Sequence, residues 1–281
     1  IAERYYRVLA SRGPEGPKPN VARTLFALEA LDSYKELEFV KDIFEKSLQW
    51  MYKSTSTGWF KEWLSTSSEY SFSQIPILKL RSDVRHTSQV ATTACMWNGK
   101  RSHLASLVNN INSAFLAGKG FWPENFGDSQ PKLLSTIYSL EALVKVTSGT
   151  YRLPCDDVLD NHTCQEVRIN IKDCCTNILK ELSLGDGLIG YSFRAPTPYL
   201  TGMTLFRLVY LTIFNSDIKE IIELMITSIL KKLRNFGWED ETVKKENRQA
   251  TRMRTNLRVI AGLSKCEDIN QLLNIDQKGH L

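Results

Sequence analysis

Residues 120–144, GFWPENFGDSQPKLLSTIYSLEALV, decide the fold of this chain. The stretch begins with a glycine, two aromatic residues and a proline, which is typical of a tight loop. Pro131 then suits a first helical turn, where its missing N–H costs nothing. The apolar residues that follow recur at helical spacing, namely Leu133, Leu134, Ile137, Leu140, Leu143 and Val144. Small residues lie between them, so other helices can approach closely. We therefore expect a glycine-aromatic loop that leads into a buried helix.

This buried helix recurs along the chain. Residues 24–31, TLFALEAL, match residues 136–143, TIYSLEAL, and further segments rich in small and apolar residues lie at 86–97, 198–211 and 249–263. The corresponding positions that we assign are Thr24, Thr92, Thr136, Thr204 and Thr255. They are roughly 45 to 70 residues apart, and self-similarity at such a period indicates a repeat architecture.

Amphipathic segments alternate with the buried ones, each with a single apolar stripe. They cover residues 35–52, 101–117, 164–182, 217–233 and, more briefly, 267–273. A helix that is apolar nearly all round must be enclosed, and a helix with one apolar stripe can enclose it. We therefore predict an all-α fold with an inner and an outer ring of helices. The alternative is an open superhelix of helical hairpins. Residues 75–80 are the one strand candidate, which Pro76 weakens.

Composition is that of a globular chain. The 281 residues are 42% hydrophobic, enough to bury a sizeable core, and the net charge of +5 is too small to indicate nucleic acid as a partner. No apolar run reaches the roughly 18 residues that a membrane span needs. Six cysteines in this length do not form a disulfide scaffold. Because the chain begins with Ile1 and shows no signal peptide, we expect one domain, residues 1–281, of a larger cytoplasmic protein.

The alternation resembles the α/α toroid of terpenoid cyclases and protein prenyltransferase β subunits, the prenyltransferase and squalene-cyclase repeat family. In that family a glycine-aromatic loop joins each outer helix to the next inner helix, which opens with proline. The matching pieces are Gly58-Trp59-Phe60, Gly120-Phe121-Trp122, Gly190-Tyr191 and Gly237-Trp238, with Pro19, Pro131 and Pro198 before their helices. The resemblance implies a toroid of about five to six helical hairpins. Five are visible, and residues 3–10 are read as the remnant of a sixth.

The chemistry of the resembled family is missing. The sequence lacks the Asp-x-Asp-Asp of the class II cyclases. Its one Asp-x-Cys, at residues 173–175, lies within the amphipathic segment 164–182 and not at the start of an inner helix, where prenyltransferases hold zinc. Cyclisation also needs aromatic faces to stabilise carbocations. The inner helices supply few, namely Phe26, Trp97, Tyr138, Tyr199, Phe206 and Tyr210. We therefore expect a non-catalytic recognition domain. An enzyme acting on an isoprenoid or other apolar substrate, and an open-groove scaffold, are the alternatives.

Two acidic and cysteine-rich segments could be taken for metal sites. Residues 156–160 match Asp-Asp-x-x-Asp, but Pro154 precedes them and a helix cap follows, so an acidic helix start is the better interpretation. The other set is Cys155, His162, Cys164, Cys174 and Cys175. Structural zinc sites use Cys-x2–4-Cys pairs, which this set lacks. We predict neither metal nor cofactor.

Polar and basic side chains gather at the starts of the predicted inner helices. They are Arg85, His86, Gln89, Lys132, Tyr199, Arg248, Arg252 and Arg254. In the resembled toroid these ends surround one mouth of the barrel, and helix N-termini attract anions. We expect an anionic small ligand or a protein partner to dock there, in a protein of signalling or defence. The alternative is a solvated rim paired with Asp83, Glu239, Asp240, Glu241 and Glu246.

Overall fold

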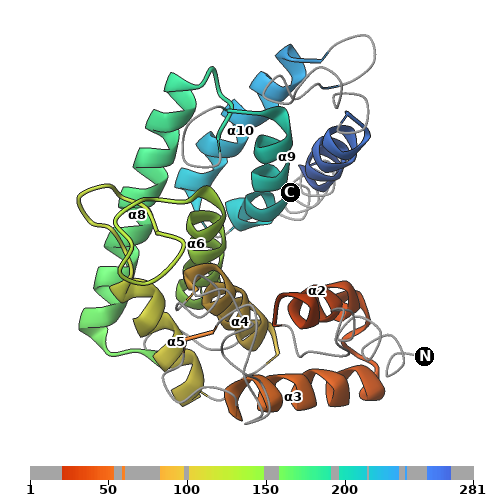
Figure 1. Cartoon of the computed structure of the whole chain (residues 1–281), viewed down its shortest axis with the longest axis vertical. Coiled ribbons are helices and arrows are strands. Elements are labelled where there is room, and N and C mark those ends of the chain that lie inside the picture. Colours follow the sequence, from red (N-terminus) through yellow and green to blue (C-terminus); the bar gives the residue numbers. More distant parts are fainter. Residues whose placement is uncertain are drawn as a thin grey trace, which may run out of the picture. The chain divides into compact units, whose positions relative to one another are not determined.

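The regular structure of this chain is helical (Figure 1). The computed structural model describes residues 21–53, 59–60, 83–97, 101–148, 158–190, 196–213, 215–233, 238 and 252–266. Within these ranges β-type pairing is confined to isolated bridges such as Leu116–Phe121, which confirms the all-α prediction. No helix in these ranges is long and apolar enough to span a bilayer. Predicted segments 3–10, 75–80 and 267–273 lie outside the described residues.

The order of helices follows the predicted alternation. The helices at the positions predicted for the buried series are α2 (Val21–Leu31), α4 (Val84–Met96), α6 (Leu133–Thr147), α9 (Pro198–Leu208) with η4 (Val209–Ile213), and the helix at 252–266. The last of these differs from the prediction, because it exposes the large apolar side chains of Met253, Leu257 and Ile260. The amphipathic series is α3 (Glu38–Lys53), α5 (Arg101–Ser113), α8 (Asn161–Leu184) and α10 (Ser216–Lys231), and η1 (Asp32–Tyr34) follows α2. Pro198 opens α9 as predicted, whereas Pro131 precedes α6 by two residues.

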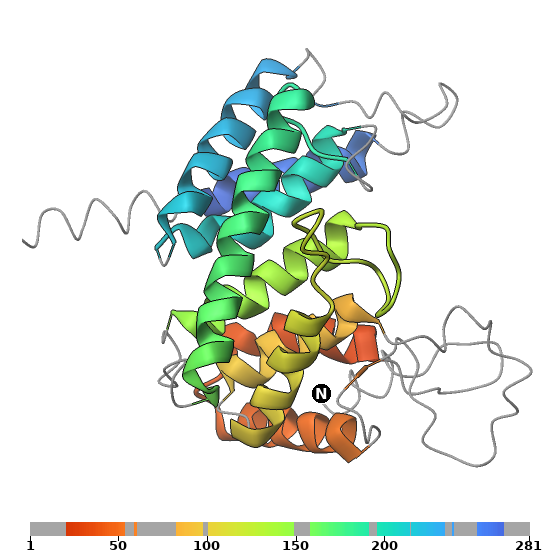
Figure 2. The same cartoon turned by 90° about the vertical axis from the view of Figure 1, so that its left-hand side faces the viewer.

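The chain groups into two compact units. Unit 1 comprises residues 1–115, 123–129 and 145–167, and unit 2 comprises 116–122, 130–144 and 168–281. In unit 1, α4 packs against α2 and α5, and α2 packs against α3. In unit 2, α10 lies along α9 and η4 (Figure 2). These buried helices therefore lie beside their amphipathic successors, as predicted. A single domain over residues 1–281 stays a prediction.

A repeated pair of hydrogen bonds joins each loop to the buried helix that follows. Ile189 donates its N–H to Thr201 Oγ1 at 3.0 Å, and its carbonyl accepts the Thr197 N–H at 3.1 Å. Phe60 makes the same two bonds with Thr87 and Asp83, and Trp122 makes them with Thr136 and Lys132. Both backbone groups of the loop residue are thereby satisfied, which a buried turn requires.

These bonds correct the predicted register of the repeat. The equivalent threonines are Thr87, Thr136 and Thr201, instead of Thr92 and Thr204 for the second and fourth helices. At the last helix Trp238 donates its N–H to Asn256 Oδ1, one residue after the assigned Thr255. The buried helices carry several threonines each, so the sequence pattern permits more than one alignment.

Glycines allow the loops to contact the amphipathic helices. Gly120 and Gly187 have φ of +71° and +76°, and a Cβ there would overlap the side chains of Asn177 on α8 and Ser228 on α10. The third loop is therefore built on Gly187-Leu188-Ile189, and the predicted counterpart Gly190-Tyr191 lies further along.

Another close contact joins α9 to the helix at 252–266. A Cβ on Gly202 of α9 would lie 2.8 Å from Val259 Cα, so α9 and the helix at 252–266 touch backbone to backbone. Small residues permit this approach, as the sequence predicted.

Candidate functional site

Seven of the eight predicted site residues lie in the described part of the chain, and Arg248 lies outside it. Unit 1 holds Arg85, His86 and Gln89, all in the first two turns of α4. Unit 2 holds Lys132 just before α6, Tyr199 in the first turn of α9, and Arg252 and Arg254 among the first described residues of the last helix. The convergence of all eight on one mouth stays a prediction.

A compact network closes the start of α4. Asp83 is the N-cap, and its carboxylate accepts the His86 backbone N–H at 3.0 Å and lies 2.6 Å from His86 Nδ1. We assign the ring proton to Nδ1, because the carboxylate there can only accept. His86 Nε2 then accepts from Arg85 Nη2 at 3.3 Å. His86 is 1% exposed and uses both nitrogens within this network, so it positions Arg85.

Electrostatics hold this network in its charged form. Burial alone would raise the pKa of the Asp83 carboxyl, but its hydrogen bonds with His86 and the nearby charge of Arg85 lower it below its ordinary value. Arg85 Nη2 lies 3.8 Å from the carboxylate, and the Arg85 side chain stays 27% exposed. The predicted basic residue at this helix start is therefore oriented by its neighbours and remains accessible.

A second pair of predicted residues is brought together in unit 2. Arg254 Nη2 donates to the Tyr199 hydroxyl at 2.6 Å, and its guanidinium carbon lies 4.6 Å from the centre of the Tyr199 ring. A cation over an aromatic face is attracted by the ring quadrupole. The start of α9 thus contacts an arginine of the helix at 252–266 that is fixed in orientation and still exposed.

Sequence reasoning missed a buried ionic cluster between α6 and α9–η4. Glu141 is 2% exposed and accepts a hydrogen bond of 2.5 Å from the Tyr210 hydroxyl. Arg207 Nη1 lies 3.8 Å from Glu141 Oε2, and the guanidinium lies over the Tyr138 ring at 4.7 Å. The sequence feature that could have indicated this cluster is a carboxylate, Glu141, within an otherwise apolar helix. Its counterpart Glu29 on α2 is exposed, however, so the pattern alone could not show which acid is buried.

The acidic segment before α8 begins a helix, as the sequence indicated. The Asp160 carboxylate accepts the Thr163 backbone N–H at 2.9 Å and the Thr163 hydroxyl at 2.7 Å. These bonds lower the pKa of this exposed carboxyl. Asp156 and Asp157 lie outside the described residues.

The described cysteines are poor metal ligands. Cys174 and Cys175 are buried free thiols of α8, and burial raises the pKa of Cys175 to about 12. Metals bind the thiolate, which such burial disfavours. Cys164 is disulfide-bonded. The described ranges contain no group of three or more His, Cys, Asp or Glu residues able to hold a metal ion. For the whole chain, the lack of a metal stays a prediction.

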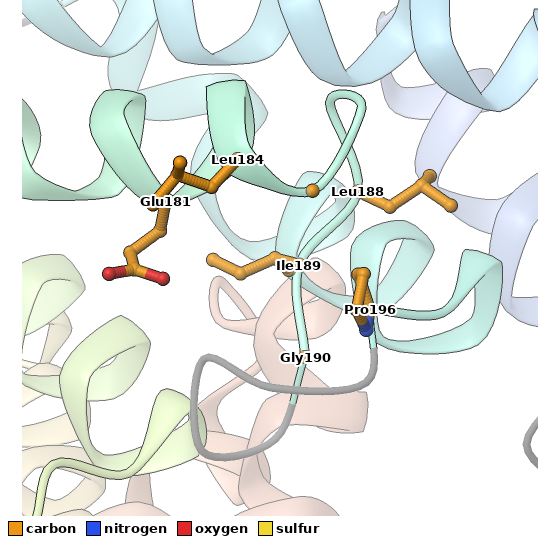
Figure 3. Close-up of a pocket in the computed structure, with 7 residues that line it drawn as sticks. Glu181, Leu184, Leu188, Ile189, Gly190 and Pro196 are labelled. Atoms are coloured by element: carbon orange, nitrogen blue, oxygen red, sulfur yellow. The ribbon is translucent and has the colours of Figure 1, made fainter.

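A small cavity lies where α8 ends (Figure 3). Its volume is about 80 Å³, room for two or three water molecules at about 30 Å³ each. The lining residues are Glu181, Leu184, Gly185, Leu188, Ile189, Gly190 and Pro196. Glu181 is the one titratable group among these seven, and none of them is a predicted site residue. This cavity follows from the geometry of the loop.

Comparisons with known proteins bear on the fold alone. No family model and no curated protein matches the chain. Among solved structures, a possible member of the GH105 family from Salmonella enterica matches with a TM-score of 0.57 at 10% identity, over 94% of this chain and 75% of that one. Candida albicans protein geranylgeranyltransferase-I complexed with GGPP matches with a TM-score of 0.54 at 14% identity, over 94% of this chain and 78% of that one.

These two neighbours have α/α toroid folds, one of them prenyltransferase-like. The fold of this chain is therefore of the α/α toroid class, which confirms the resemblance at the level of the fold. Identities this low carry no statement about activity, because one fold serves many unrelated functions.

Proposed function

We propose that this chain is a non-catalytic recognition domain of a larger cytoplasmic protein that acts in signalling or defence. An anionic small ligand or an acidic protein partner docks at the starts of the buried helices. Arg252 and Arg254 make the main contacts, and the remaining members of the site are Arg85, His86, Gln89, Lys132, Tyr199 and Arg248.

The observation that carries this proposal is the pairing of Arg254 with Tyr199. A surface arginine ordinarily samples many rotamers, and ordering it costs entropy when it binds. Here the hydroxyl at 2.6 Å and the ring beneath hold the guanidinium in place before any ligand arrives. Arg252 lies two residues before Arg254 on the same helix. A helix start there would add positive potential through its unpaired backbone N–H groups. Preorganised cations at a helix start suit an anionic group.

Two arginine substitutions test this site. Arg252→Ala together with Arg254→Ala should weaken binding of pyrophosphate or a hexaglutamate peptide by more than about tenfold, since charge-assisted contacts contribute about 1.5–3 kcal/mol each. The melting temperature should change little. Arg258→Ala is the matched control, because Arg258 is an exposed arginine of the same helix. Normal binding by the double variant, or equal loss in the Arg258 variant, refutes the proposal.

A specific observation favours the enzyme alternative as second candidate. Tyr138 and Tyr210 flank the buried Glu141–Arg207 pair, so aromatic faces and a proton-bearing group occur together. Such a cluster suits an apolar substrate with a reacting polar end. Geranylgeranyl diphosphate is a suitable test substrate. Pyrophosphate release that Glu141→Gln abolishes supports catalysis, and no release by the unaltered protein removes this candidate.

The cytoplasmic part of the proposal has a direct test in the thiols. Cys164 is disulfide-bonded, and disulfides persist in oxidising compartments. Alkylation of the protein under denaturing conditions at lysis should label all six cysteines if the protein resides in the cytoplasm. A loss of two thiols that returns on reduction would place it in an oxidising compartment.

A further inference from the structure

Three polar side chains on one face of α4 bury atoms that have no hydrogen-bond partner among the described residues. They are Arg85 Nε, Gln89 Oε1 and Thr92 Oγ1. Gln89 and Thr92 are 7% and 8% exposed. The spacing of i, i+4 and i+7 places all three on the same side of the helix. We call this set the α4 polar face.

Native proteins seldom leave buried polar atoms unmet, because each has lost its hydrogen bonds to water. Thr87 on the same helix shows the ordinary situation, since its hydroxyl accepts from Phe60 and donates to the Asp83 carbonyl. Thr204 of α9 is also unpartnered, but it is a single hydroxyl with no exposed surface. The α4 polar face differs because three such atoms are aligned.

The α4 polar face leads inward from an accessible cation. Arg85 is 27% exposed, and Gln89 and Thr92 follow at greater depth. One turn beyond Thr92, the buried ammonium of Lys145 lies 3.6 Å from Met96 Sδ. Seven residues of helix rise about 10 Å, the length of a small two-ended molecule. A carboxamide and a hydroxyl thus follow the Arg85 cation along the helix.

We propose that the α4 polar face binds a small ligand in which an anionic group is joined, about 6 Å away, to an N–H donor. The Arg85 Nε–H donates to the anionic group, and Gln89 Oε1 accepts from the N–H. The Thr92 hydroxyl serves as donor or acceptor to the same end of the ligand. The inference rests on the proposed function in so far as Arg85 and Gln89 belong to its site, and it adds Thr92 and the ligand class.

Two kinds of molecule share this chemistry, an amino-bearing nucleotide and a short acidic peptide. A carboxamide reads the adenine edge by accepting from N6 and donating to N7. AMP should therefore bind better than IMP by about tenfold or more, because IMP offers an acceptor where Gln89 needs a donor. The peptide arm uses acetyl-Asp-Gly-amide, whose amide N–H takes the place of the adenine amine. If AMP binds, the ligand is a nucleotide, and if the peptide binds, the ligand is an acidic peptide.

The variants are Gln89→Met and Thr92→Val, combined in one protein and measured by calorimetry with AMP, IMP, the peptide and pyrophosphate. Both replacements keep the side-chain shape and remove unmet polar atoms, so the unliganded protein should be as stable as the parent or more so. Binding of AMP or of the peptide should fall by about tenfold or more. Thr87→Val is the contrasting variant, and it should destabilise because the Phe60 N–H loses its acceptor.

Three outcomes overturn the inference. The first is that neither AMP nor the peptide binds the unaltered protein at about 1 mM, which would leave ordered water as the partner of these atoms. The second is that the combined variant is destabilised as strongly as the Thr87 variant. The third is unchanged binding by the combined variant. Failure of the proposed function alone would give a different result. AMP would then still bind, and replacing Arg252 and Arg254 would leave pyrophosphate binding unchanged.

Discussion

Replacing Thr201 by valine should destabilise this protein measurably while leaving its shape intact. Thr201 is fully buried, and its hydroxyl accepts the Ile189 backbone N–H at 3.0 Å and donates to the Thr197 carbonyl at 2.8 Å. Valine has nearly the same shape and removes the acceptor. The Ile189 N–H is then left buried without a partner, because Ile189 itself is 1% exposed.

The magnitude follows from that orphaned donor. A buried polar group that loses its partner costs about 1–3 kcal/mol. Unfolding entropy is about 2.1 cal/mol/K per residue, so 281 residues give about 0.6 kcal/mol/K. The melting temperature should therefore fall by about 2–5 °C. Thr201→Ser keeps the hydroxyl and should restore most of the lost stability.

Thr204→Val is the matched control for this experiment. Thr204 lies on the same helix and is equally buried, yet its hydroxyl has no partner among the described residues. Removing that hydroxyl should be neutral or stabilising. Urea denaturation followed by circular dichroism measures all three variants. Equal destabilisation by the Thr201 and Thr204 valines would refute the reasoning, because the loop bond would then have no special role.

Three further predictions concern the loops, the buried acid and the helix cap. Gly127→Ala should cost about 1–2 kcal/mol of stability because of its positive φ alone. Gly120→Ala should cost more because its Cβ also meets Asn177, whereas Gly118→Ala should be tolerated. A reversed order of stabilities in thermal denaturation would contradict this prediction. Glu141→Ala should cost about 3–5 kcal/mol because Arg207 loses its buried partner. Glu29→Ala should cost less because Glu29 is exposed, and equal effects of the two substitutions in urea denaturation would disprove the cluster. Asp83→Asn should lower the free energy of unfolding at pH 7. The difference in free energy of unfolding between the variant and the parent should stay constant down to about pH 4 and shrink below it. The reason is that a carboxyl with a lowered folded-state pKa adds stability that is lost as the pH falls through that pKa. A difference that grows towards low pH would contradict the last of these.

Much of the fold was readable from periodicity. Buried helices such as α6 can be predicted from the sequence because apolar residues recur at helical spacing with small residues between them. Their amphipathic partners, such as α10, show one apolar stripe for the same reason. Pro198 at the start of α9 and Gly120 in a positive-φ turn are local rules that operate wherever these residues occur.

The equivalent positions of the repeated helices could not be predicted from the sequence. Thr87 and Thr92 lie on one helix, and nothing local tells which hydroxyl meets the Phe60 N–H. Likewise Gly190 looks as much like a loop glycine as Gly187, but only Gly187 lies against Ser228. These choices depend on which backbone groups need partners once helices pack, a non-local requirement.

The candidate site was also predicted only in part from the sequence. The sequence by itself determined that basic and polar side chains occupy the starts of the buried helices, since helix boundaries follow from local pattern and capping. Only the tertiary structure decided that Tyr199 orients Arg254, that Asp83 and His86 orient Arg85, and that Glu141 is buried against Arg207 while Glu29 is exposed. Tyr199 and Arg254 are 55 positions apart, and the distance between two such side chains is set by helix packing, which no local stretch of sequence encodes.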